Sequence, residues 1–202
     1  MDEDLETRVR RLYAAIGEVV IDDMSRFAPV VGQAPGWVFM YQDWRGGLSD
    51  EQLSNLAHAA INNVANLRNH LYAWVGRQGR SKEAVTYTVR QSFELQVLID
   101  LANNERHGYP PKPGQSQSGR CPRLTEVKRV LRLSTGISPN SIASITMMPM
   151  PTPMNTGSGS TNVIVTGTVL DQTGLVIGDL YDFLEKGVKA WEALLPRLGL
   201  HL

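Results

Sequence analysis

The feature that most constrains the fold is a long amphipathic segment that begins at Ser49. Serine is a favoured helix N-cap, and Ser49 with Gln52 fits a capping box, in which two side chains satisfy backbone N–H groups. The segment predicts a helix that ends at Gly76 or Gly79 and needs a core against one face. Its apolar stripe, spaced every three or four residues, is Leu53, Leu56, Ala60, Val64, Leu67, Leu71 and Trp74.

A second helix is predicted directly after this one, from a serine cap at Ser81 to about His107, where Gly108 follows as a C-terminal cap. The short link between the two helices indicates an antiparallel helical hairpin. Residues 95–102, LQVLIDLA, are apolar almost all the way round, which is typical of a buried helix.

Two further helices are predicted near the ends of the sequence, over residues 3–27, ending near Pro29, and over about 178–197. Between the first of them and Ser49, residues 28–48 are predicted to form an ordered loop. Its aromatic side chains are expected to cover one end of the core, and they are Trp37, Phe39, Tyr41 and Trp44.

The character of the chain changes after His107. Residues 109–124 are rich in Pro, Gly, Ser and Gln, which predicts a loop. The segments VKRVLRLS, SIASITMMPM and TNVIVTGTVL then predict three short antiparallel strands. The expected fold is mainly α (α+β) and forms a single domain, 1–202. It is a bundle of about four helices (1–108 and 175–202), with the loop 109–124 and a three-stranded β insertion (127–171) before the C-terminal helix.

Composition narrows the class of protein. Lys+Arg and Asp+Glu both number 20, which argues against a strongly basic nucleic-acid platform. One cysteine excludes a disulfide framework and a cysteine-rich zinc site. The start MDEDLETRVRR lacks the apolar core of a signal peptide, and no run is long enough to span a membrane. We therefore expect a cytoplasmic protein without membrane partners.

Asp100 is the only charge within LQVLIDLA, and a buried carboxylate needs partners. On a helix, Asp100, Asn103 and His107 share one face, with Asn104 at its edge. This predicts a polar line that leaves the core under the 109–124 loop. The line is either structural, holding the loop, or catalytic, with His107 as acid or base and Arg106 binding phosphate.

A second polar line lies opposite the leucine stripe of the first helix and consists of His58, Asn62, Asn66 and Asn69, after Asn55. Asparagine is a poorer helix former than Lys or Glu, so the pattern favours a face turned toward another surface, with a plain solvated face as the alternative. The hairpin register predicts that His58 and Asn62 approach Asp100 and Asn103.

Other motifs carry little chemistry. The sequence has no HExxH, CxxC or GxSxG, and its histidines lack the spacing of a metal site, so no cofactor or metal is expected. The segment 106–132 is rich in Lys and Arg, which suits either a phosphate-binding patch or a charged sheet edge.

The segments 62-NNVANLRNHLYAW-74 and 99-IDLANNERHG-108, with TGTVLDQTG (166–174) and Trp191, resemble a group of uncharacterised bacterial and prophage-type helical proteins. A helical bundle with Arg-Asn and His at helix ends is also distantly similar to the HEPN superfamily, whose members include ribonucleases and toxin components. The HEPN signature places a histidine four to six residues after an arginine. None of His58, His70 and His107 has an arginine at this spacing. The one pair that does, Arg197 and His201, lies at the frayed end of the sequence, so the motif is not carried over.

Two functional hypotheses follow. The first is a non-catalytic binding or assembly protein with a protein partner or as a homodimer, acting through the asparagine face or the β insertion. The second is a HEPN-like ribonuclease or toxin component that acts on RNA through Asp100, Asn103, Arg106 and His107.

Overall fold

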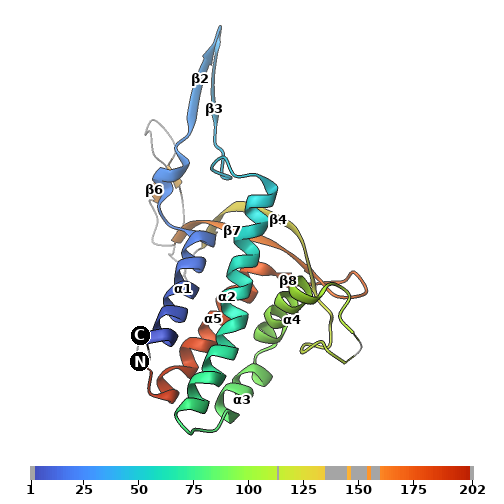
Figure 1. Cartoon of the computed structure of the whole chain (residues 1–202). Coiled ribbons are helices and arrows are strands. Elements are labelled where there is room, and N and C mark those ends of the chain that lie inside the picture. Colours follow the sequence, from blue (N-terminus) through green and yellow to red (C-terminus); the bar gives the residue numbers. More distant parts are fainter. Residues whose placement is uncertain (1–2, 113, 135–144, 147–153, 156–159, 201–202) are drawn as a thin grey trace, which may run out of the picture.

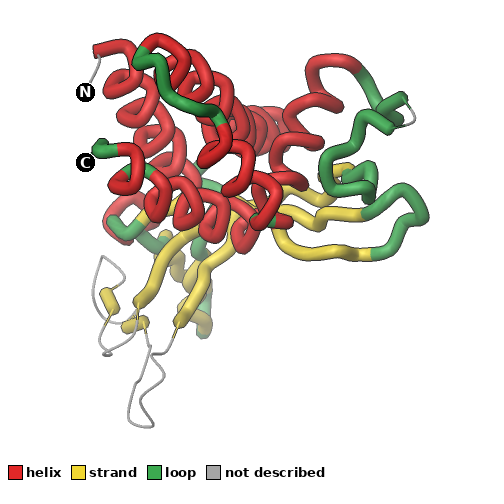
Figure 2. The backbone as a smooth tube through the Cα atoms, turned by 90° about the horizontal axis from the view of Figure 1, so that it is seen from below, coloured by secondary structure: helices red, strands yellow, loops and turns green. Residues whose placement is uncertain are grey.

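The computed structural model describes residues 3–112, 114–134, 145–146, 154–155 and 160–200. The chain forms a layer of helices packed on one face of an antiparallel sheet, from which a long hairpin projects (Figures 1 and 2). The helices are α1 (Glu3–Val19), α2 (Asp50–Arg77), α3 (Glu83–Gln91), α4 (Phe93–His107) and α5 (Leu180–Leu194), with short 3-10 turns at Met24–Phe27 and Pro196–Leu198.

The sheet is built around β7 (Ser160–Leu170). This strand pairs with β1 (Val20–Ile21) along one edge, with β4 (Arg123–Ser134) along the other, and near its end with β8 (Val176–Asp179). Two further antiparallel pairs lie within the described residues: the hairpin of β2 (Val30–Ala34) with β3 (Trp37–Tyr41), and β5 (Ile145–Thr146) with β6 (Met154–Asn155).

The fold is therefore α+β, but two parts of the predicted architecture are wrong. The strands do not form a three-stranded insertion, because β1 from the start of the chain and β8 next to α5 complete a four-stranded sheet. The helices do not form a four-helix bundle, because they cover that sheet and the predicted helix 81–107 is broken at Ser92. There the backbone is extended, and the serine side chain caps α4. Of the predicted strand 141–150, only Ile145–Thr146 lies within the described residues.

The first helix is also shorter than predicted, ending at Val19 so that Val20–Ile21 can pair with β7. By contrast, the predicted capping box at Ser49 is present, since Ser49 Oγ accepts a hydrogen bond from Gln52 N, and Gln52 Oε1 accepts one from Ser49 N. A strong local signal thus determines where this helix begins.

One large apolar core joins the helices to the sheet and takes residues from α1, α2, α4, α5 and β7. A smaller core of Ile21, Met24, Phe27 and Val163, with Trp44 and Leu131 packed on it, lies where the projecting hairpin begins. No helix in the described ranges is both long and apolar enough to cross a bilayer.

Candidate functional site: the Asp100 loop and the projecting hairpin

Asp100 is 2% exposed and anchors the loop that follows α4. Its carboxylate accepts four hydrogen bonds from that loop: from Ser116 Oγ (2.6 Å), Gln117 N (2.6 Å), Ser118 N (2.9 Å) and Ser118 Oγ (2.6 Å). The prediction that Asp100 is buried and paired is confirmed. All four donors are neutral hydroxyl or backbone N–H groups, so they pair the carboxylate through hydrogen bonds rather than through an opposite charge.

The polar line continues toward solvent as expected. Asp100, Asn103 and His107 all line one cavity of about 660 Å³, which is bordered on the other side by the loop that includes Lys112 and Gln117. Asn104, at the edge of the line, donates from Nδ2 to the carbonyl of Pro122 at 2.7 Å and so ties the far end of the loop to α4.

The polar face of α2 meets the end of α4 at a different register from the one predicted. Asn62 Nδ2 donates to Glu105 Oε2 at 2.6 Å, and Arg106 donates to Asn66 Oδ1 at 3.0 Å. His58 Nδ1 also lies 3.4 Å from Glu105 Oε2. The prediction that His58 and Asn62 approach Asp100 and Asn103 is therefore wrong, because their partner is Glu105, further along α4.

These contacts account for His58, Asn62 and Asn66 without an external partner. The side chains of His58, Asn62 and Asn66 are half-buried against α4, whereas Asn69 is exposed and lies 3.4 Å from Arg68 Nε. Uncharged amides suit such an interface, since each supplies a donor and an acceptor without a charge to desolvate.

Among the described residues that line the Asp100 cavity, no pair joined by a hydrogen bond has the form that nucleophilic or acid–base catalysis usually requires. No hydrogen bond joins His107 to Asp100 in the described part of the chain, and Asp100 is already engaged by the loop. Arg106 is turned toward Asn66 of α2. A catalytic role for Asp100, Asn103, Arg106 and His107 stays a prediction. Nor do the described residues contain a cluster of His, Cys, Asp or Glu able to hold a metal ion.

A second candidate site is the β2–β3 hairpin, which projects from the body beyond the end of α1 (Figure 1). The expectation that its aromatics cover the core is wrong for three of them, since Trp37, Phe39 and Tyr41 are 76%, 55% and 61% exposed. Only Trp44, beyond the hairpin, packs inward, with its ring 6.0 Å from that of Phe27.

The three exposed aromatics of the hairpin lie on one face. Alternate residues of a strand point the same way, and the register pairs Trp37 with Ala34, Phe39 with Gly32 and Tyr41 with Val30. The Phe39 ring lies over Gly32, where a Cβ atom would come within 2.2 Å of it. Large side chains on β3 therefore stand beside small ones on β2.

The hairpin could have been found from sequence. Two runs rich in Val and aromatic residues, VVGQA and WVFMY, flank a Pro-Gly pair, which is a turn signal. The aromatic residues of 28–48, which favour a place in the core, had more weight in the prediction from sequence than this turn signal.

The comparisons with known proteins add no family. No family model matches the chain, and neither the curated proteins nor the solved structures that were searched contain a match.

Proposed function

We propose that this is a non-catalytic assembly protein that binds a second copy of itself through the β2–β3 hairpin. The observation that carries the proposal is the aromatic face of Trp37, Phe39 and Tyr41, exposed on an arm that projects from the body. Monomeric proteins rarely expose apolar patches larger than a few hundred Å², and larger ones mark interaction sites.

The unprotected edges of the hairpin also support binding of a second copy. Residues 28–42 contain no charged side chain, although natural edge strands are commonly protected by charges or bulges. A two-stranded hairpin is also only marginally stable in water, and further strands or a packing partner stabilise it. An added partner would supply both the missing strand pairing and cover for the aromatic face.

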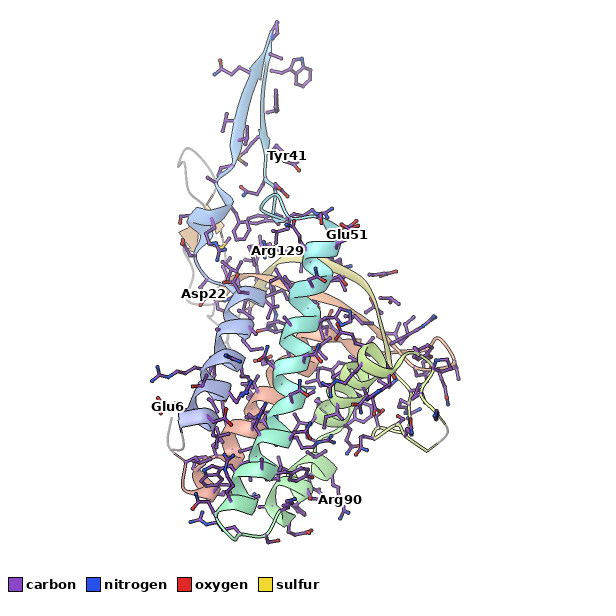
Figure 3. The ribbon with its side chains drawn as sticks, viewed as in Figure 1. Glu6, Asp22, Tyr41, Glu51, Arg90 and Arg129 are labelled. Atoms are coloured by element: carbon purple, nitrogen blue, oxygen red, sulfur yellow. The ribbon has the colours of Figure 1, made fainter. Side chains whose placement is uncertain are left out.

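The base of the hairpin is held in place, as a docking arm requires. Gln42 donates from Nε2 to the carbonyl of Phe27, the rings of Phe27 and Trp44 pack together, and Arg129 donates to the carbonyl of Arg45 at 2.9 Å. Figure 3 shows Tyr41 on the arm and Arg129 in the body below it. The arm is thus presented in one direction, which lowers the entropy lost on binding.

A second copy fits this surface on area and on charge. The three aromatics expose on the order of 400 Å², about half of the roughly 800 Å² that each partner buries in a standard interface. Valine side chains and strand pairing from two hairpins would supply part of the rest. The chain has zero net charge, so copies do not repel at long range.

Light scattering coupled to size exclusion, over a wide concentration range, tests the proposal. The wild type is expected to form a dimer and Trp37→Ser/Tyr41→Ser to be monomeric. Leu175→Ser is the matched control, because Leu175 is 62% exposed but lies outside the hairpin. A wild type that is monomeric throughout, or a double variant that dimerises like the wild type, would contradict the proposal.

The second candidate is RNA cleavage in the Asp100 cavity. It is supported by the size of the cavity, within the range of ligand sites, and by the presence of His107 and Lys112 in its lining. In this reading Asp100 positions the loop and His107 acts as acid or base. RNA cleavage by the wild type that His107→Ala abolishes, without change in the melting temperature, would favour it.

A further inference from the structure

A cavity of about 350 Å³ lies between the end of α1, the start of α2 and β4, below the projecting hairpin. Its polar lining comes from α1, the turn Met24–Phe27, α2 and β4. The residues that matter here are Glu18, Arg26, Gln52, Asn55 and Arg129, together with the ring of Phe27.

Arg129 is unusual because it is charged yet only 9% exposed. One terminal nitrogen donates to the carbonyl of Arg45, and the guanidinium lies 5.7 Å from the centre of the Phe27 ring. Its Nε is buried without a hydrogen-bond partner, and no carboxylate of the described residues is within ion-pair distance. Buried guanidinium groups are normally paired.

The neighbouring charges leave this cavity positive. Burial, and then the positive charge of Arg26, lower the pKa of Arg129, while Glu18 and Asp43 act in the opposite direction. The Asp43 carboxylate is already used by the backbone N–H groups of Arg45 and Gly47. Two guanidiniums and one carboxylate, that of Glu18, line the cavity, which gives one net positive charge.

The amide of Gln52 adds a directed donor. Its Oε1 is fixed by the capping box, where it accepts from Ser49 N at 2.8 Å. The other end of the amide, Nε2, is therefore the donor that remains for a ligand. Guanidinium forks and amide N–H groups together match the oxygens of a carboxylate or phosphate group.

We infer that this cavity is a binding site for a small oxyanion, a carboxylate or a phosphate group, held between Arg26 and Arg129 with Gln52 as a further donor. The apolar lining from Phe27, Leu48 and Leu56 leaves room for a short organic part on the anion. The site is close to the lower size limit of ligand pockets, so a larger ligand would extend into solvent. The inference is independent of the assembly proposal.

Calorimetric titration of the full chain with inorganic phosphate and with benzoate, at constant ionic strength set by chloride, tests the site. Saturable binding of either anion is expected in the wild type. Arg26→Gln should weaken it by about tenfold or more, because one of the two cationic partners is lost. Arg26 is exposed, so this variant should fold normally.

Arg90→Gln is the matched control, since Arg90 is also exposed and lies at the opposite end of the molecule from Arg129 (Figure 3). It removes the same charge and should bind as the wild type does. Arg129→Lys keeps the positive charge but loses the planar guanidinium, which can donate two parallel hydrogen bonds to an oxyanion, and should also weaken binding. Binding of phosphate alone or of benzoate alone would identify the group that is recognised. Absence of saturable binding in the wild type, or equal weakening in Arg26→Gln and Arg90→Gln, would overturn the inference.

Discussion

At the residue scale, one carboxylate holds the middle of the loop between α4 and β4, because Asp100 receives hydrogen bonds from three consecutive loop residues, 116–118. The pattern of one acid inside an apolar helix is visible in the sequence and correctly predicts a buried, paired group. The identity of its partners is not visible there, since Ser116, Gln117 and Ser118 carry no local signal that distinguishes them from ordinary loop residues.

Asp100→Ala should lower the free energy of unfolding by about 2 kcal/mol, since it leaves two backbone N–H groups and two hydroxyls without their acceptor. The loss should stay below that for a broken buried ion pair, because the partners are neutral. Chemical denaturation gives the value, and amide exchange at Gln117 and Ser118 should speed up. Unchanged exchange in this loop would show that Asp100 does not hold it.

His70 on α2 predicts a pH effect on stability. Partial burial, and then the charge of Arg8 on α1, lower its pKa below the ordinary 6.5. Between the lowered pKa and 6.5, the unfolded chain binds more protons at His70 than the folded chain does. The contribution of His70 to the free energy of unfolding is therefore fully present above pH 6.5 and is lost as the pH falls below that value. His70→Gln should make the melting temperature less dependent on pH in that window than it is in the wild type. A slope unaffected by His70→Gln would contradict the assignment.

At the scale of elements, the sequence predicts those that carry their own local signals. The helix α2 has a capping box and a regular apolar stripe, and α5 has a similar stripe. The strand β1 could not be predicted in this way, because two residues gain their conformation only from pairing with β7, more than a hundred residues away. The break at Ser92 was detectable in principle, since serine is a favoured helix N-cap and Glu94 places an acidic residue in the first turn that follows.

Gly187 lets helix α5 pack closely against α2 and α4. A Cβ atom there would lie 2.8 Å from Leu98 Cδ1 and 3.4 Å from Val64 Cγ1. One turn on, Trp191 Nε1 donates to the carbonyl of Val64 at 2.9 Å, which fixes the same spacing. Gly187→Val should therefore destabilise the fold by about 2 kcal/mol through overpacking.

Gly17 provides the matched contrast, because it lies in α1 and an added Cβ atom would have no neighbour within 4 Å. Gly17→Ala should stabilise the protein by roughly 0.5–1 kcal/mol through helix propensity alone. Thermal and urea unfolding of both variants would measure the difference. Equal effects at the two positions would mean that the helix contact at Gly187 is not tight.

At the scale of the whole molecule, the structure separates a body that is stabilised by two apolar cores from an arm that contributes to neither. None of the described side chains between residues 30 and 41 belongs to the core clusters, whereas Phe27 and Trp44, on either side of the arm, belong to the smaller one or pack on it. This division explains why the aromatic residues of 28–48 are assigned to the core from the sequence. The composition of a segment shows that it is apolar, whereas only the tertiary structure shows that it projects away from the body.

The same division predicts that the arm can be removed without unfolding the body. Replacing residues 31–40 with a short Gly-Ser turn should change the free energy of unfolding by no more than about 0.5 kcal/mol, as for other changes far from a core. Trp44→Ala, which leaves the arm in place but opens the smaller core, should cost about 3 kcal/mol. The arm deletion should also abolish self-association, whereas Trp44→Ala should retain it at temperatures where the variant is folded. If the deletion unfolds the protein and Trp44→Ala does not, the hairpin is part of the body's stability rather than a binding arm.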